Sequence, residues 1–122
     1  ELGADKRLGD IDVLAWRGDG KVLVIECKRL QHARTVGEVA EQLRKFKGEA
    51  EDLLRKHLNR VDWVCTHQDL LKRATGVQVH EIHHFLVTNT DVPMMYSQDL
   101  PLQPSLVVPT HLLGVTLQSK FV

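Results

Sequence analysis

Three charged side chains near the N-terminus are of the types that carry out metal-dependent hydrolysis. Asp12 precedes a turn rich in Gly and Asp, and Glu26 and Lys28 follow an apolar, β-branched run. Two carboxylates can hold a hard cation such as Mg²⁺ or Mn²⁺ through oxygen, and the cation polarises a phosphate and lowers the pKa of a bound water. An ammonium beside them would orient that water or stabilise charge on the phosphorus. The residue types therefore indicate cleavage of a phosphate ester, provided that the chain brings them together.

A β-hairpin would bring these side chains together. The first predicted strand ends at Trp16 and the second begins at Val22, with a glycine-containing turn between them. If these two residues pair, Asp12 lies opposite Glu26, with Cβ atoms about 4.5–5.5 Å apart. Side chains alternate along a strand, so Glu26 and Lys28 share a face. Two carboxylates so close repel each other, and a bound cation would offset the repulsion.

At these residues the chain resembles the PD-(D/E)xK nuclease superfamily, the fold of restriction endonucleases and Holliday-junction resolvases. Asp12 stands where the superfamily has its strand-borne Asp, and Glu26-Cys27-Lys28 stands as its (D/E)-x-K. The resemblance implies a nuclease in which Asp12, Glu26 and the backbone carbonyl of Cys27 hold the metal and Lys28 acts in catalysis. Asp10 would be a further acid near the site. An ordinary edge hairpin with solvated charges is the alternative.

A helix is predicted after the hairpin. Thr35 and Glu38 form a capping box, and apolar residues then recur at helical spacing over 36–58. Gln42 and Phe46 are similar to the Q-x-x-x-Y motif of the RecB-like branch of the superfamily. That similarity implies that Gln42 lies near the metal as a catalytic residue, and a solvated helix position is the alternative.

Basic side chains around this helix are expected to bind nucleic acid. Arg29 and Arg34 precede the helix and Lys45 lies on it, and such groups can neutralise phosphates. Interleaved acids such as Glu41 leave open a solvated helix face instead. DNA is the expected partner, with RNA and a homodimer left open.

The rest of the chain predicts an α/β fold. A second helix is expected to stop at Gly76, a strand to lie within 77–88, and a last strand to span 112–117. The resemblance implies a restriction-endonuclease-like core, in which a central mixed β-sheet is flanked by helices. That core begins with a helix before its first strand. Residues 1–9 are too short to supply it, so the first helix is expected to be missing or truncated.

A rival metal motif occurs at residues 80–84, whose sequence His-Glu-Ile-His-His matches the H-E-x-x-H signature of zinc peptidases. That mechanism needs a helix, because only then do histidines four apart share a face. The β-branched flanks, including Val79 and Val87, favour a strand, and no glutamate follows Glu81 as a third ligand. We therefore expect these histidines to lie on a strand.

Composition bounds the remaining possibilities. A chain of 122 residues with 43% hydrophobic residues suits one domain, over 1–122. Its net charge is zero, but 13 of its 16 Lys and Arg fall in residues 1–60. We therefore expect the functional residues to lie in the first half of the chain. Cys27, expected to be buried, and Cys65 form no disulfide framework, which suits the cytoplasm. No apolar run approaches the roughly 20 residues of a membrane span.

Two further expectations concern the whole chain. It begins at Glu1 without Met, which suggests a part of a longer chain. A module that kept the nuclease fold but lost activity, and that binds nucleic acid or protein, is the alternative to an active Mg²⁺- or Mn²⁺-dependent enzyme.

Overall fold

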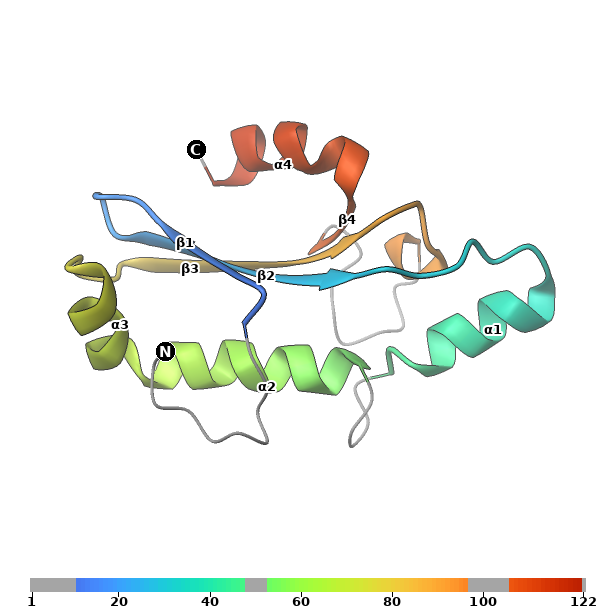
Figure 1. Cartoon of the computed structure of the whole chain (residues 1–122), viewed down its shortest axis with the longest axis horizontal. Helices are drawn as coiled ribbons and strands as arrows, with labels where there is room; N and C mark the ends of the chain where they lie inside the picture. The colour runs from blue at the N-terminus through green and yellow to red at the C-terminus, as the bar shows by residue number, and fades with distance from the viewer. Residues whose placement is uncertain (1–10, 48–52, 97–105, 122) are drawn as a thin grey trace.

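A four-stranded mixed sheet forms the centre of the computed structural model, which describes residues 11–47, 53–96 and 106–121. The strands lie in the order β1-β2-β3-β4, where β1 is antiparallel to β2 and the other neighbours are parallel. Helices cover both faces of the sheet (Figure 1). The α/β class and the mixed sheet are thus confirmed, whereas the restriction-endonuclease-like core stays a prediction. The strands are Val13–Trp16 (β1), Lys21–Lys28 (β2), Glu81–Thr88 (β3) and Val107–Pro109 (β4).

The hairpin has the predicted register. Trp16 pairs with Val22 and Val13 with Ile25. The backbone N–H of Arg17 donates to the carbonyl of Lys21 at 2.9 Å and closes the turn. Extending this antiparallel register by one residue places Asp12 opposite Glu26. The local sequence therefore sets up the pairing on which the candidate site depends.

Two helices replace the single helix predicted over 36–58, which is a correction. α1 spans Val36–Arg44 and α2 spans Leu53–Thr66. The predicted capping box opens α1. The helix ends because the N–H groups of Lys45 and Phe46 donate to carbonyls three residues back, which tightens the last turn. The helical spacing is therefore divided between two helices, and residues 48–52 lie outside the described part of the chain.

The last predicted strand, over 112–117, is also wrong. α4 spans Leu113–Lys120 after a single 3-10 turn, and the fourth strand is the preceding segment β4. Leu113 and Leu117 are four residues apart and both pack against the core cluster around Phe85. Residues with this spacing share one face of a helix, so the segment buries them by forming a helix. α3, Gln68–Thr75, ends as expected at Gly76, whose φ is 72°.

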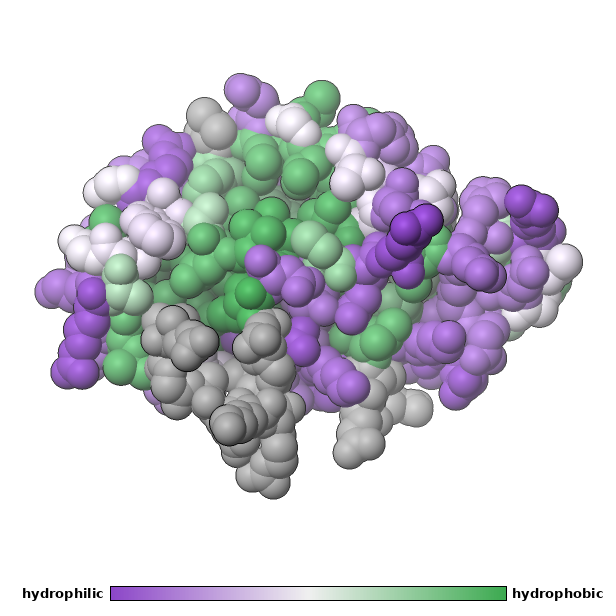
Figure 2. Space-filling model, viewed as in Figure 1, coloured by the Kyte–Doolittle hydropathy of each residue, from purple (hydrophilic) through white to green (hydrophobic). Residues whose placement is uncertain are grey.

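The core has one layer on each side of the sheet because strand side chains alternate. α2 and α3 cover one face, and α4 covers the other (Figure 1). In the same view, Figure 2 shows hydrophobic residues over the middle of the molecule and hydrophilic ones around α1. The α2 layer contains Val22, Val24, Val61, Val64, Leu71 and Val79. The α4 layer contains Leu23, Ile25, Phe85, Val87, Val108 and Phe121.

None of the helices in the described residues has both the length and the apolar character needed to cross a membrane. The helix expected to be missing before β1 would fall in residues 1–10, which lie outside the described part.

Candidate functional site

Glu26 is a buried charged residue near the end of β2. It is 3% exposed and lies on the sheet face covered by α2. Its Oε1 is 3.1 Å from Nζ of Lys28, and its Oε2 is 2.5 Å from Nη1 of Arg60. A buried carboxylate is costly unless cations or hydrogen bonds compensate it. Here two cationic groups, one from β2 and one from α2, hold the carboxylate.

Lys28 reaches this carboxylate because residues two apart share a strand face. Its side chain is 29% exposed, whereas that of Glu26 is 4% exposed. The ammonium therefore lies between the buried carboxylate and solvent. This is a position from which it can contact both Glu26 and a bound anion.

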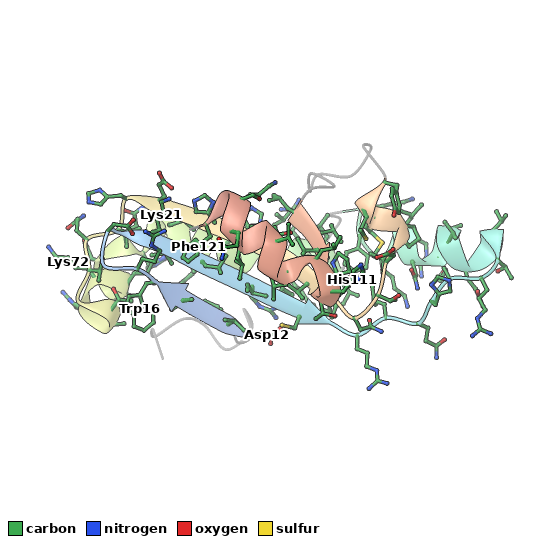
Figure 3. All side chains as sticks on the ribbon, turned by 90° about the horizontal axis from the view of Figure 1, so that it is seen from above. Asp12, Trp16, Lys21, Lys72, His111 and Phe121 are labelled. Carbon is green, nitrogen blue, oxygen red and sulfur yellow. The ribbon has the colours of Figure 1, made fainter. Side chains whose placement is uncertain are left out.

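Asp12 lies immediately before β1, against β2. Its Oδ2 accepts a hydrogen bond of 2.7 Å from the backbone N–H of Cys27. Figure 3 shows Asp12 and Trp16 at the two ends of β1, alongside β2. The bond places an exposed carboxylate against the backbone of Cys27, the residue that follows Glu26. Asp10 lies outside the described residues.

Cys27 is exposed, so the expectation that it is buried is wrong. The reason is that β1 pairs with β2 only as far as Ile25, and Cys27 lies beyond that pairing. The pKa of its thiol is nevertheless raised, first by partial desolvation and then by the carboxylates of Asp12 and Glu26. The thiol is therefore protonated near neutral pH and is a poor nucleophile.

Sequence reasoning missed two contributions of α2, Arg60 and His57. His57 is 1% exposed, and its Nε2 lies 3.2 Å from Nδ1 of His84 on β3. Its Nδ1 has no hydrogen-bond partner among the described residues. Burial lowers the pKa of His57 to about 4, with His84, Arg60 and Lys28 adding to the effect. His57 is therefore neutral at pH 7 and adds no positive charge beside Arg60.

A signal for His57 did exist in the sequence. His57 falls between Leu54 and Val61 in the apolar spacing of the helix, where a polar residue must be buried. Arg60 follows one turn later. Nothing local shows that Arg60 meets Glu26, which is 34 residues away.

The histidine-rich segment forms β3, as expected from its flanks, and the helix that a zinc peptidase needs is not formed there. His84 faces α2, while Nε2 of His83 lies 3.0 Å from a carboxylate oxygen of Glu81. The described residues contain no group of three or more His, Cys, Asp or Glu side chains that could hold a metal ion.

Oxygen donors are nevertheless present for a hard cation. Mg²⁺ is commonly held by one or two carboxylates and keeps several waters. Asp12, Glu26 and the backbone carbonyl of Cys27 supply such donors. Glu26 lies on β2, and Asp12, just before β1, contacts the next residue of β2, Cys27. In the structure, however, Oε1 of Glu26 is paired with Lys28 and Oε2 with Arg60, and Oδ2 of Asp12 accepts from the N–H of Cys27.

Gln42 lies on α1 and contacts the segment that follows β2. Its Nε2 donates to the carbonyl of Gln31, and its Oε1 is buried without a hydrogen-bond partner among the described residues. Within that part of the chain, its hydrogen bond leads to Gln31 and not to Glu26 or Lys28. The structure thus pairs Glu26 with Lys28, places Asp12 against the backbone of Cys27, and places Gln42 beside the segment that follows β2.

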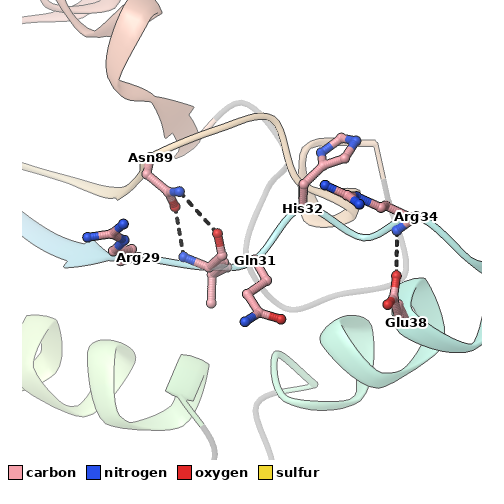
Figure 4. A pocket seen from close by; sticks show the side chains of 7 residues that line it. Arg29, Gln31, His32, Arg34, Glu38 and Asn89 are labelled. Atoms are coloured by element: carbon pink, nitrogen blue, oxygen red, sulfur yellow. Dashed lines mark hydrogen bonds between the residues drawn. The ribbon is translucent and has the colours of Figure 1, made fainter.

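The predicted phosphate-binding residues divide into two groups. Arg29 and Arg34 line an open pocket of about 530 Å³ (Figure 4), whereas exposed Lys45 caps the end of α1. Asn89 fixes the pocket wall through two hydrogen bonds to the backbone of Leu30, at 2.7 and 3.0 Å. The pocket is lined by Arg29, Leu30, Gln31, His32, Arg34, Glu38 and Asn89.

Comparison with known families identifies the group to which the chain belongs. Residues 3–111 match the family model described as anti-phage protein Upx-like. The chain belongs to the Upx-like family of anti-phage proteins. The match covers the hairpin, α2 and β3, and so it includes every residue of the candidate site. No curated protein and no solved structure matches this Upx-like chain.

Proposed function

We propose that this Upx-like protein is a metal-dependent nuclease that hydrolyses phosphodiester bonds of nucleic acid, with DNA as the expected substrate. One observation carries the proposal. The buried carboxylate of Glu26 lies 3.1 Å from the ammonium of Lys28, and Asp12 is hydrogen-bonded to the backbone N–H of Cys27, which lies between these two residues in the chain. A sheet rarely keeps two facing carboxylates without a partner of opposite charge, and this arrangement matches the one that the sequence resemblance implies. An anti-phage family is a natural setting for an enzyme that cuts DNA.

Each residue of the proposed site has a distinct role. Asp12, Glu26 and the carbonyl of Cys27 would hold Mg²⁺ or Mn²⁺, which supplies a polarised phosphate and an activated water when bound. Lys28 would hold the attacking water or the phosphate oxygens through its ammonium, which lies at the solvent edge of the buried carboxylate. The low exposure of Glu26 keeps water away from one side of the site and strengthens these electrostatic contacts.

The segment leaving β2 would guide the nucleic acid. Arg29 follows Lys28 directly, Arg34 lies six residues after it, and both line the open pocket, so a phosphate backbone could run from this pocket to the cation site. Lys45 would add a more distant contact at the end of α1. We expect the enzyme to act in the cytosol, where injected DNA is found.

A cleavage assay tests this proposal. Supercoiled plasmid and single-stranded DNA are incubated with Mn²⁺ and either wild-type protein or Lys28→Ala. We expect wild-type cleavage that requires the metal, and a loss of about 100-fold or more in Lys28→Ala, because a positioned charge or proton-transfer group typically contributes that much. Lys21→Ala is the matched control, since it removes the same charge from the other end of β2.

Two outcomes would contradict the nuclease. Cleavage that is equal in wild type and Lys28→Ala would remove Lys28 from the site. Retarded DNA mobility without any cleavage would favour the alternative, a nuclease fold that binds without cutting. That alternative is supported by the contacts of Lys28 and Arg60 with Glu26, which engage both carboxylate oxygens.

A further inference from the structure

Arg60 is a charged residue that reaches the site from a separate element. It lies on α2, its side chain is 13% exposed, and its Nη1 is 2.5 Å from Oε2 of Glu26. We propose that Arg60 is an internal counter-ion that competes with the divalent cation for Glu26, so that the guanidinium contact weakens metal binding. The inference rests on the proposed function, because it concerns the same carboxylate.

The first step of the argument is the charge count around Glu26. Lys28 and Arg60 bring two positive charges to Glu26, and Asp12 brings the second negative charge, so the four groups are neutral together. His57, one turn from Arg60, is neutral and adds nothing at pH 7. A divalent cation added to this set leaves two uncompensated positive charges in a partly buried region. Such an excess is unfavourable unless one of the resident cations moves away.

The second step concerns which oxygen the metal can reach. Both oxygens of Glu26 face a cationic group, Oε1 the ammonium of Lys28 and Oε2 the guanidinium of Arg60. A metal bound through a remaining lone pair of either oxygen would lie beside a resident positive charge, and the repulsion between them weakens that contact.

The third step identifies Arg60 as the group that moves. Lys28 is tied to Glu26 by the geometry of one strand, where residues two apart share a face. Arg60 approaches from a different element on a long side chain. A guanidinium that leaves Glu26 stays near the site, where its planar fork suits a phosphate in two-point contact. Displacement therefore moves a positive charge from the protein carboxylate towards the substrate.

Mn²⁺ binding to Arg60→Gln tests the competition, measured by calorimetry or by the electron paramagnetic resonance of free Mn²⁺. We expect a dissociation constant about five- to tenfold lower than in wild type, as expected when one competing charge is removed from a partly buried site. Lys56→Gln is the matched control, because it removes the same charge from an exposed position of α2. It should bind Mn²⁺ as the wild type does.

The outcomes separate this inference from the function on which it rests. Mn²⁺ binding by wild type with equal or weaker affinity in Arg60→Gln overturns the role of Arg60 alone. Failure of both proteins to bind Mn²⁺ overturns the metal site and the inference with it. Mn²⁺ binding by Arg60→Gln but not by wild type would show that Arg60 prevents the metal from binding to Glu26.

A second measurement uses the wild-type protein, so that it does not depend on the folding of a variant. Mg²⁺ is titrated into protein labelled with ¹⁵N, and the side-chain Nε–H signal of Arg60 is followed, assigned by its loss in Arg60→Lys. We expect this signal to shift over the same range of Mg²⁺ concentration as the backbone amide signal of Cys27. An Arg60 signal that stays constant while Cys27 responds would show that the guanidinium keeps its contact with Glu26.

Discussion

At the scale of single residues, His57 is a buried histidine with one ring nitrogen that lacks a hydrogen bond among the described residues. Its ring lies beneath the sheet against His84, and its Nδ1 has no hydrogen-bond partner among the described residues. Burial, His84 and the nearby cations all disfavour its protonated form, and its pKa is about 4. The folded protein therefore keeps His57 neutral under conditions in which the unfolded chain protonates it.

This difference predicts how stability depends on pH. Above the usual pKa of about 6.5, both states hold His57 neutral and it has no effect on stability. As pH falls from 6.5 towards 4, the unfolded state gains the proton first. The free energy of unfolding should then fall by up to about 3 kcal/mol through this residue. The lowered pKa of His84 acts in the same direction.

Urea unfolding of wild type and His57→Leu between pH 7 and 4 measures the effect. The variant should lose less stability over this range than the wild type does. His32→Gln serves as the control, since His32 is an exposed histidine on the segment after β2. Parallel curves for wild type and His57→Leu would contradict the neutral, buried assignment.

At the scale of elements, the turn between β1 and β2 is fixed by Gly20. Its φ is 94°, a left-handed value that favours glycine. Its carbonyl accepts a bond of 2.8 Å from the N–H of His80, so the turn is also tied to the start of β3. An added Cβ would lie 2.5 Å from the carbonyl oxygen of Gln78, which is closer than atoms can approach.

Gly20→Ala should therefore be strongly destabilising. We expect a loss of at least about 2 kcal/mol in the free energy of unfolding, from the strained backbone and the close contact combined. Gly18→Ala in the same turn is the control, because a Cβ there meets no atom within 4 Å. Chemical unfolding of both variants measures the difference, and similar losses for the two would refute the packing described for this turn.

At the scale of the whole molecule, the candidate site depends on contacts between elements that are distant in the chain. β1 and β2 supply Asp12, Glu26 and Lys28, and α2 supplies Arg60. The hairpin part was predictable, because turn chemistry and strand alternation act over a few residues. Arg60 was not, because its partner is set by how α2 packs on the sheet.

The same distinction explains the errors in the fold. The capping box of α1, the glycine stop of α3 and the strand β3 all follow from local patterns, and they are confirmed. The strand β4 has only three residues, and its identity comes from pairing with β3, which no local pattern shows. Local spacing likewise does not show where a long helical stretch is divided by a tightened turn, as it is after Arg44.

The central claim is that Asp12 and Glu26 hold a divalent cation beside Lys28. Broadening of the backbone amide NMR signals by bound Mn²⁺ tests this claim, because every amide near the ion responds. In a ¹⁵N-labelled sample titrated with sub-stoichiometric Mn²⁺, the account predicts that the amide of Cys27 broadens first and that Glu26→Gln abolishes the effect. Earliest broadening at His83 or His111, or unchanged broadening of Cys27 in Glu26→Gln, would contradict it.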